Sequence, residues 1–177
     1  MRCLTLGEAL RESGAEVQFV CRSHSGNLIE LIRRKKFIVR KLPAPDTQQS
    51  KPVSGADTKS DYNRWLGTSQ EQDAFKTIEV FQEKRPDWLI VDHYALSQIW
   101  ETLLRPHVRK IMVIDDLADR PHDCDLLLNQ NYFLESETRY EGLLPPTCTK
   151  LLGPQYALLR TEFAEARKHL KTRTGKV

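Results

Sequence analysis

Short apolar runs that end in polar side chains recur through the second half of the chain. The run at residues 88–91 is followed by an acid, an imidazole and a phenol, and later runs at 111–114 and 126–128 are followed by acids and amides. In chain order, these polar residues are Asp92, His93, Tyr94, Asp115, Asp116, Asn129 and Asn131. Side chains that can bind or react therefore follow three successive runs.

An apolar run of four or five residues without polar alternation predicts a strand covered on both faces, as in a parallel sheet flanked by helices. Further strands are predicted at 16–21, 37–42 and 150–152. In open parallel sheets, ligands bind beyond the carboxyl ends of the strands. The polar residues after the three runs are therefore predicted to share the edge of the sheet where a small molecule would bind.

Amphipathic segments alternate with these strands. The opening helix is predicted to end at Gly14, capping boxes at Asn27 and Ser69 begin the next two helices, and Ser97 begins the fourth. The predicted inward faces are Cys3, Leu6, Gly7 and Leu10; Leu28, Leu31 and Ile32; Phe75, Ile78 and Phe81; and Ile99, Trp100, Leu103 and Leu104. A last helix is predicted from 161 to about 170. The alternation predicts a doubly wound, Rossmann-like α/β fold.

The length of 177 residues predicts one domain. Residues 43–61, rich in Pro, Gly, Ser, Thr, Gln and Asp, are predicted to form a surface loop, and 171–177 a tail. The opening helix has no strand before it, although a strand–helix–strand fold ordinarily begins with a strand. The expectation is therefore that the chain starts inside a domain, which is incomplete and lacks its first strand.

Composition narrows the possible partners. The net charge of +3 is mild, and no stripe of Lys and Arg interleaves with aromatic residues, which argues against nucleic acid. The four cysteines are scattered without a C-x-x-C pair, so reduced thiols in a cytoplasmic protein, with no metal site, are expected. No apolar run approaches the roughly 18 residues of a membrane span, so no membrane partner is expected.

His93 has two interpretations of equal weight. An imidazole at a strand exit titrates near neutrality and can take a proton from water, and it can equally bind the backbone of a neighbouring loop. Tyr94 is interpreted as a hydroxyl donor to a ligand rather than as a cover for the sheet. His107 and His122, beside prolines, are predicted at the surface, and His169 is predicted to be structural or solvated. His24 is a weaker site candidate. 

The acids and amides are also open to two interpretations. Asp92 and Asp115 can bind sugar hydroxyls or hold catalytic groups, whereas a capping role is favoured for Asp116. Asn129 and Asn131 suit the hydroxyl and acetamido groups of sugars, and turn formation explains them as well. The common nucleotide, acyl-transfer and zinc motifs are absent from the sequence. Residue chemistry alone thus predicts a ligand-binding α/β domain.

Five segments together resemble a known enzyme family, the UDP-2,4-diacetamido-2,4,6-trideoxy-β-L-altropyranose hydrolases of pseudaminic acid biosynthesis. The segments begin with Met-Arg-Cys-Leu at residues 1–4 and Val-Asp-His-Tyr at 91–94. They continue with Ile-Asp-Asp-Leu-Ala-Asp-Arg at 114–120, Cys-Asp-Leu-Leu-Leu-Asn-Gln-Asn at 124–131 and Gly-Pro-Gln-Tyr-Ala-Leu-Leu-Arg-Thr-Glu-Phe at 153–163. The combination, in order and at matching spacing, carries the resemblance.

The resemblance implies a GT-B-like architecture of two Rossmann-like domains with the site between them. It implies that water attacks the anomeric carbon with inversion and that UDP leaves, without a metal or cofactor. It further implies a role in pseudaminic acid biosynthesis and hence in flagellin glycosylation. The positions carried over as sugar-side or cleft-lining residues are Asp92, His93, Tyr94, Asp115, Asn129, Asn131 and Tyr156.

The chain also departs from the family pattern. The family has a first strand and a Gly-x-Gly-His loop before Met-Arg-Cys, with the histidine as general base, and a second domain that binds UDP. The expectation is a truncated N-terminal domain without that histidine or that second domain, which a separate chain could supply. The alternatives are a GT-B glycosyltransferase domain, in which a sugar acceptor replaces water, and an inactive remnant that binds a ligand or partner.

Overall fold

The computed structural model describes residues 1–44, 65–81, 84–135 and 138–169. Its elements are α1 (Arg2–Glu12), β1 (Gln18–Arg22), α2 (Ile29–Arg34), β2 (Ile38–Leu42), α4 (Gln70–Phe81), β3 (Trp88–Val91), α5 (Gln98–Leu104), η2 (Arg105–His107), β4 (Lys110–Ile114), β5 (Leu126–Asn129), β6 (Thr149–Leu152), η3 (Pro154–Tyr156) and α6 (Thr161–Lys168). None of the described helices is long and apolar enough to cross a membrane.

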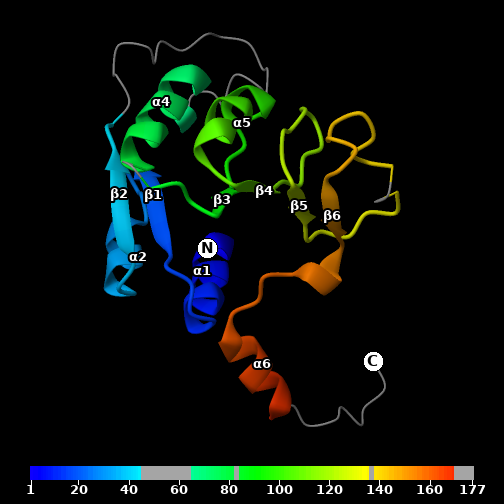
Figure 1. Ribbon diagram of the computed structural model, residues 1–177. Helices are drawn as coiled ribbons and strands as arrows, with labels where there is room; N and C mark the ends of the chain where they lie inside the picture. Colours follow the sequence, from blue (N-terminus) through cyan, green and yellow to red (C-terminus); the bar gives the residue numbers. More distant parts are fainter. Residues whose placement is uncertain (45–64, 82–83, 136–137, 170–177) are drawn as a thin grey trace.

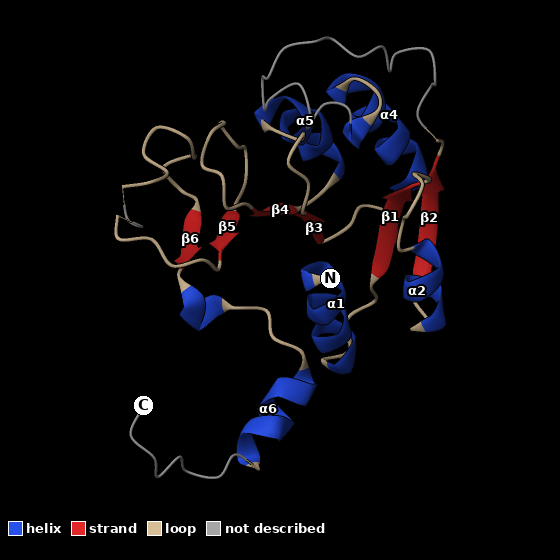
Figure 2. Ribbon diagram, turned by 180° about the vertical axis from the view of Figure 1, so that it is seen from behind, coloured by secondary structure: helices blue, strands red, loops and turns tan. Residues whose placement is uncertain are grey.

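Parallel strands flanked by helices make up the fold (Figure 1). β1 pairs with β2 in one sheet, and β3, β4, β5 and β6 follow one another in a second sheet, with every pairing parallel. In both views, α4 and α5 lie on one side of the four-stranded sheet and α1 and α6 on the other (Figures 1 and 2). The structure confirms the predicted Rossmann-like α/β fold, with open sheets rather than a closed barrel.

β3 is less buried than its uninterrupted apolar sequence predicts. Trp88 is 46% exposed, and Val91 alone of its four residues is buried. The reason is its position, because within the described residues β3 pairs with β4 on one side only. β4 and β5 lie inside the sheet and match the prediction of fully covered strands, with Ile111 and Leu127 completely buried. β1 likewise pairs only with β2 within the described residues.

The apolar side chains form two separate cores. The larger core joins α4 and α5 to the four-stranded sheet and includes Ala74, Trp100, Leu104, Val113 and Leu127. The smaller core joins α1 and α2 to the two-stranded sheet and includes Leu4, Ile32 and Phe37. No apolar cluster spans both cores within the part of the chain that the structure describes, so other interactions contribute to joining them.

The opening helix α1 packs closely against β1 because Gly7 has no side chain between them. A Cβ atom at this position would lie 3.0 Å from the ring of Phe19 in β1, so the missing side chain lets α1 contact that strand. Leu4, rather than the predicted Cys3, is the buried residue of the first turn. Gly14 adopts a φ of 93° after the helix, as its predicted role in termination requires.

The predicted inward faces of α2, α4 and α5 each include one exposed residue, while their other residues pack against the two cores. Leu28, Phe75 and Ile99 are 46%, 57% and 53% exposed, respectively. α2 begins at Ile29, where the Asn27 side chain accepts a hydrogen bond from the backbone, so Ile29 faces the core in place of Leu28. α4 begins as predicted, with Ser69 accepting from the Gln72 amide, but its buried residues are Asp73, Ala74 and Thr77.

His122 is buried, which makes the prediction of a surface histidine wrong. Its Nδ1 lies 2.7 Å from Oε1 of the buried Glu101 in α5, whose other oxygen accepts from the Asp123 amide at 2.6 Å. The pairing with Glu101 explains why the surface prediction for His122 was wrong. The buried carboxylate provides a hydrogen-bond partner for an imidazole that would otherwise need water. His107 is exposed as predicted, and His169 is also exposed. The loop expected at 43–61, from residue 45 onward, and the tail at 171–177 lie outside the described residues.

Ion pairs link the two cores. Arg22, at the end of β1, pairs with Asp73 of α4, and both side chains are at most 10% exposed. Asp73 also accepts a hydrogen bond from the Trp100 indole at 2.9 Å. A second link joins Arg2 of α1 to Asp92, which directly follows β3. Charged residues in largely buried positions therefore contribute to holding the two parts together.

Replacing Asp73 by Ala is expected to lower the free energy of unfolding by about 3 kcal/mol, because it leaves a buried guanidinium and a buried indole N–H without their acceptor. Urea denaturation followed by circular dichroism measures the change. The matched control is Glu79→Ala on the same helix, which removes an exposed pair with Lys76 and should cost about 0.5 kcal/mol or less. Equal effects of the two substitutions would contradict the role assigned to Asp73.

Candidate functional site

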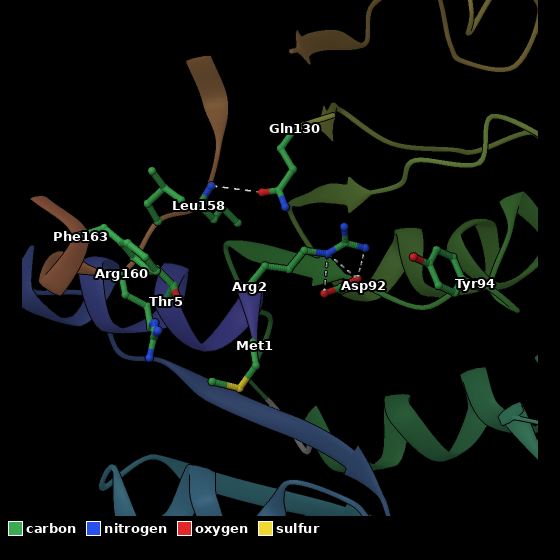
Figure 3. A pocket seen from close by; sticks show the side chains of 10 residues that line it. Met1, Arg2, Thr5, Asp92, Tyr94, Gln130, Leu158, Arg160 and Phe163 are labelled. Atoms are coloured by element: carbon green, nitrogen blue, oxygen red, sulfur yellow. Dashed lines mark hydrogen bonds and ion pairs between the residues drawn. The ribbon is translucent and has the colours of Figure 1, made fainter. Parts of the chain in front are cut away.

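An open groove of about 510 Å³ lies at the carboxyl end of β3, within the size range of small-molecule sites. Its walls come from the first turn of α1, the exit of β3, the loop after β5 and the segment leading into α6 (Figure 3). The lining residues are Met1, Arg2, Thr5, Asp92, Tyr94, Gln130, Leu158, Leu159, Arg160 and Phe163. The groove thus brings together parts of the chain that lie far apart in sequence.

Arg2 and Asp92 form the polar centre of the groove. The Arg2 guanidinium donates to Asp92 at 2.7 Å through Nη2 and at 3.1 Å through Nε, and it lies 3.7 Å from Asp116 (Figure 3). The Cys3 thiol donates to the same Asp92 carboxylate at 3.4 Å. Burial and the neighbouring Asp92 raise the pKa of Cys3 to about 12, so this thiol stays protonated. Hydrogen bonding to Asp92 raises the pKa of Arg2 further.

Tyr94 lines the groove on the side away from α6 (Figure 3). Its ring lies 6.3 Å from the Trp65 ring, centroid to centroid. Burial and the negative charge of Asp116 raise the pKa of the phenol, so Tyr94 keeps its proton at neutral pH and can donate a hydrogen bond. Tyr94 thus lines the groove as a protonated phenol.

His93 is not among the residues that line the groove, and its ring binds the loop that follows it. Its Nδ1 accepts a hydrogen bond from the Ala95 amide at 3.1 Å, which places the proton of the neutral ring on Nε2. Burial lowers the pKa of His93, and its charged neighbours include Asp73, which opposes the shift. These contacts match the second interpretation of His93, in which the ring binds the backbone of a neighbouring loop and fixes that loop.

Asp115 and Asn129 brace the sheet edge from within. Both are almost completely buried, and the Tyr140 hydroxyl joins them, donating to the Asp115 carbonyl at 2.9 Å and accepting from Asn129 at 3.0 Å. The Asp115 carboxylate also pairs with Arg120 at 3.0 Å and accepts from the Ala118 amide. These two residues share one rim of the sheet, as predicted, and they face its interior rather than the groove.

The other predicted residues lie around the rim. The Asn131 side chain donates a hydrogen bond to Asp116 at 3.1 Å, and the Asn131 backbone amide donates one to the Asn129 side chain. This loop is therefore a side-chain-stabilised turn. Tyr156 ends η3 and is 41% exposed, outside the residues that line the groove. Of the seven predicted site residues, Asp92 and Tyr94 line the groove; the others surround it.

Sequence reasoning missed most of the lining residues. Arg2 belongs to the first turn of a helix that precedes the strands, so the rule of strand ends does not indicate it. Gln130 lies between the two predicted asparagines, and its carbonyl accepts from the Leu158 amide at 3.1 Å. Arg160 and Phe163 stack at 5.2 Å at the start of α6. The family motifs at 1–4, 124–131 and 153–163 contain all the missed lining residues except Thr5.

The chemistry of the groove is that of hydrogen bonding. Asp92 is already engaged by Arg2 and Cys3, while Tyr94, the amide nitrogen of Gln130 and Arg160 are donors by chemical nature. Among the described residues, no group of three His, Cys, Asp or Glu is placed to hold a metal ion. The arrangement suits a ligand rich in acceptor oxygens.

No family model matches the chain. A curated protein of Campylobacter jejuni subsp. jejuni, UDP-2,4-diacetamido-2,4,6-trideoxy-beta-L-altropyranose hydrolase, is 38% identical over 95 residues. The match covers 53% of this chain and 34% of the relative, so it spans about a third of that protein's length. The similarity supports the motif resemblance over the aligned part.

The His93 imidazole is expected to titrate below its ordinary value near 6.5, because burial disfavours the charged ring. The unfolded chain then binds this proton at higher pH than the folded chain, so the stability contributed by neutral His93 is present above about pH 6.5 and is lost as the pH falls. NMR titration of the ring, assigned with His93→Gln, gives the midpoint, and ¹⁵N shifts give the tautomer. A midpoint at or above 6.5, or a proton on Nδ1, would contradict this assignment.

Proposed function

We propose that this chain forms the sugar-binding half of a nucleotide-sugar hydrolase that acts on UDP-2,4-diacetamido-2,4,6-trideoxy-β-L-altropyranose in pseudaminic acid biosynthesis. The observation that carries the proposal is the groove at the carboxyl end of β3, which the family motifs line from four separate segments. The partial identity to the Campylobacter jejuni hydrolase supports the same assignment. 

The groove has the polarity that such a ligand needs. Two acetamido groups and a diphosphate present acceptor oxygens, and the Tyr94 hydroxyl, the Gln130 amide nitrogen and the Arg160 guanidinium are matching donors. Leu158 and Phe163 add apolar surface on the same wall, which suits the methyl group of a 6-deoxy sugar. In this assignment, recognition of the sugar depends on neutral donors and one exposed cation.

The proposed reaction is hydrolysis at the anomeric carbon. A water oxygen forms a bond to that carbon, the bond from the carbon to the UDP oxygen breaks, and the water proton passes to a base. UDP is a stable leaving group, so the reaction mainly requires an oriented water and stabilisation of the diphosphate charge. Attack opposite the leaving group gives inversion.

The contacts of the acid and the imidazole favour a second candidate function, ligand binding without turnover. Asp92 accepts hydrogen bonds from Arg2 and Cys3, and the Nδ1 atom of His93 accepts one from a backbone amide. Neither group is therefore placed to take a proton from water. We accordingly assign sugar recognition to these described residues and assign the general base to a group beyond them, on the same or a separate chain.

The decisive experiment separates hydrolysis, transfer and binding. The purified chain is incubated with the UDP-sugar without an acceptor, and free sugar and UDP are followed by ¹H and ³¹P NMR. Release of both products supports hydrolysis, and turnover that starts only when a sugar acceptor is added supports a glycosyltransferase instead. In parallel, calorimetric titration with the UDP-sugar, UDP and the free sugar tests recognition. Saturable binding without turnover supports the second candidate, and the absence of binding and turnover contradicts both.

Tyr94→Phe is expected to weaken sugar binding by about 3- to 10-fold, because it removes one donor worth about 0.5–1.5 kcal/mol and keeps the ring. The dissociation constant from calorimetry checks this value. The matched control is Tyr132→Phe, which removes the hydroxyl of a tyrosine that is 71% exposed and outside the groove lining. An unchanged constant in Tyr94→Phe would remove Tyr94 from the proposed site.

A further inference from the structure

Two cysteines meet at the end of the sheet opposite the groove. The Sγ atoms of Cys124 and Cys148 lie 3.6 Å apart. Cys124 comes just before β5 and Cys148 just before β6, so both belong to the segments that enter neighbouring parallel strands. All four cysteines of the chain are free thiols in this structure, and Cys3 and Cys21 lie in the other part of the molecule, on α1 and β1.

Backbone hydrogen bonds hold the two segments that carry the pair side by side. The amide of Thr149 donates to the carbonyl of Asp125 at 2.9 Å, and Leu126 pairs with Thr149 in the sheet. A disulfide requires an S–S distance of about 2.05 Å, so the sulfur atoms must approach by only about 1.5 Å, which side-chain rotation provides. The strands themselves need not separate or slip.

The two thiols differ in access and in acidity. Cys124 is buried at 2% exposure, whereas Cys148 is partly exposed. The hydrogen bond from Cys124 lowers the pKa of Cys148, assisted by the Leu127 backbone, and the same contact together with burial raises the pKa of Cys124. Cys148 is therefore the thiol that reacts with an external reagent, and Cys124 is positioned to resolve the product.

We propose that Cys124 and Cys148 are a redox modification site, at which a small disulfide such as oxidised glutathione converts the two thiols into an intramolecular disulfide between the entries of β5 and β6. The inference rests on the position of the two sulfur atoms and on their unequal exposure. It is independent of the proposed hydrolase activity.

The reaction proceeds by two exchanges. The Cys148 thiolate attacks one sulfur of the small disulfide, whose S–S bond breaks and releases one thiolate. The Cys124 thiol then loses its proton to water as its sulfur attacks Sγ of Cys148, and a second small thiolate leaves. Two protein thiols are thus oxidised, one small disulfide is reduced to two thiols, and dithiothreitol reverses the exchange.

The disulfide would constrain the segment that carries part of the groove. The closed loop runs from 124 to 148 and contains Asn129, Gln130 and Asn131, while β6 leads on to Leu158 and Arg160. Linking the two strand entries restricts the unfolded chain over this loop, so the folded state gains stability. Oxidation is expected to raise Tm by roughly 5–10 °C, given the loop length and the size of the chain.

The test uses the full chain, incubated at pH 8 with oxidised glutathione and quenched in acid. The number of thiols titrated after denaturation is expected to fall from four to two. Trypsin digestion without reduction should give a cross-linked pair of peptides, 111–139 with 140–150, about 2 Da lighter than their sum. Dithiothreitol should restore the four thiols and return Tm to its starting value.

Variants identify the sulfur atoms. In Cys3→Ser/Cys21→Ser, which keeps the pair, oxidation should remove both remaining thiols, whereas in Cys148→Ser no intramolecular disulfide should form. Cys148 is chosen for this variant because it is partly exposed and its replacement leaves the buried sulfur in place. A count that stays at four, a lasting glutathione adduct on Cys148 without the cross-linked peptides, or a disulfide that involves Cys3 or Cys21 would each overturn the proposal.

Discussion

Two ion pairs between separate cores are the interactions on which the arrangement of this molecule depends. Arg22 pairs with Asp73 and Arg2 pairs with Asp92, each joining the part built on β1 and β2 to the part built on β3 to β6. β1 and β3 both have an unpaired edge within the described residues, and no apolar cluster spans the two parts. Between these two parts, ion pairs therefore take the stabilising role that backbone hydrogen bonds and apolar contacts have elsewhere in the fold.

The ion pair between Arg2 and Asp92 also shapes the groove. A guanidinium and a carboxylate that hold each other in two hydrogen bonds gain both charge neutralisation and fixed orientation. The same engagement leaves Asp92 with little capacity for a ligand, because three donors already point at it. Asp92, which the sequence suggests as a sugar ligand or a support for catalytic groups, thus also helps to hold the two cores together.

The sequence predicts the fold well and the site only in part. Apolar runs located β3, β4 and β5 to within one residue, and the short segment from Lys150 to Leu152 located β6 equally well. Burial on both faces explains the apolar sequences of β4 and β5, which lie inside the sheet. The predicted inward face of α4 was right for Ile78 and Phe81, which pack against the larger core, but it included the exposed Phe75 and missed Asp73. Asp73 is buried by partners on β1 and α5, and a single sequence does not reveal a partner 51 residues away. His122 was misplaced for the same reason, since Glu101 lies on another element.

The strand-end rule located the correct edge of the sheet without distinguishing its bracing residues from its lining residues. Asp115 and Asn129 emerge from β4 and β5, which lie inside the sheet, so their side chains meet Tyr140 and become buried. Asp92 and Tyr94 emerge from β3, whose neighbour on one side is absent from the described sheet, so they meet the groove instead. The position of a strand within its sheet, which only the tertiary structure gives, therefore decides whether an equivalent polar residue supports the edge or contacts a ligand.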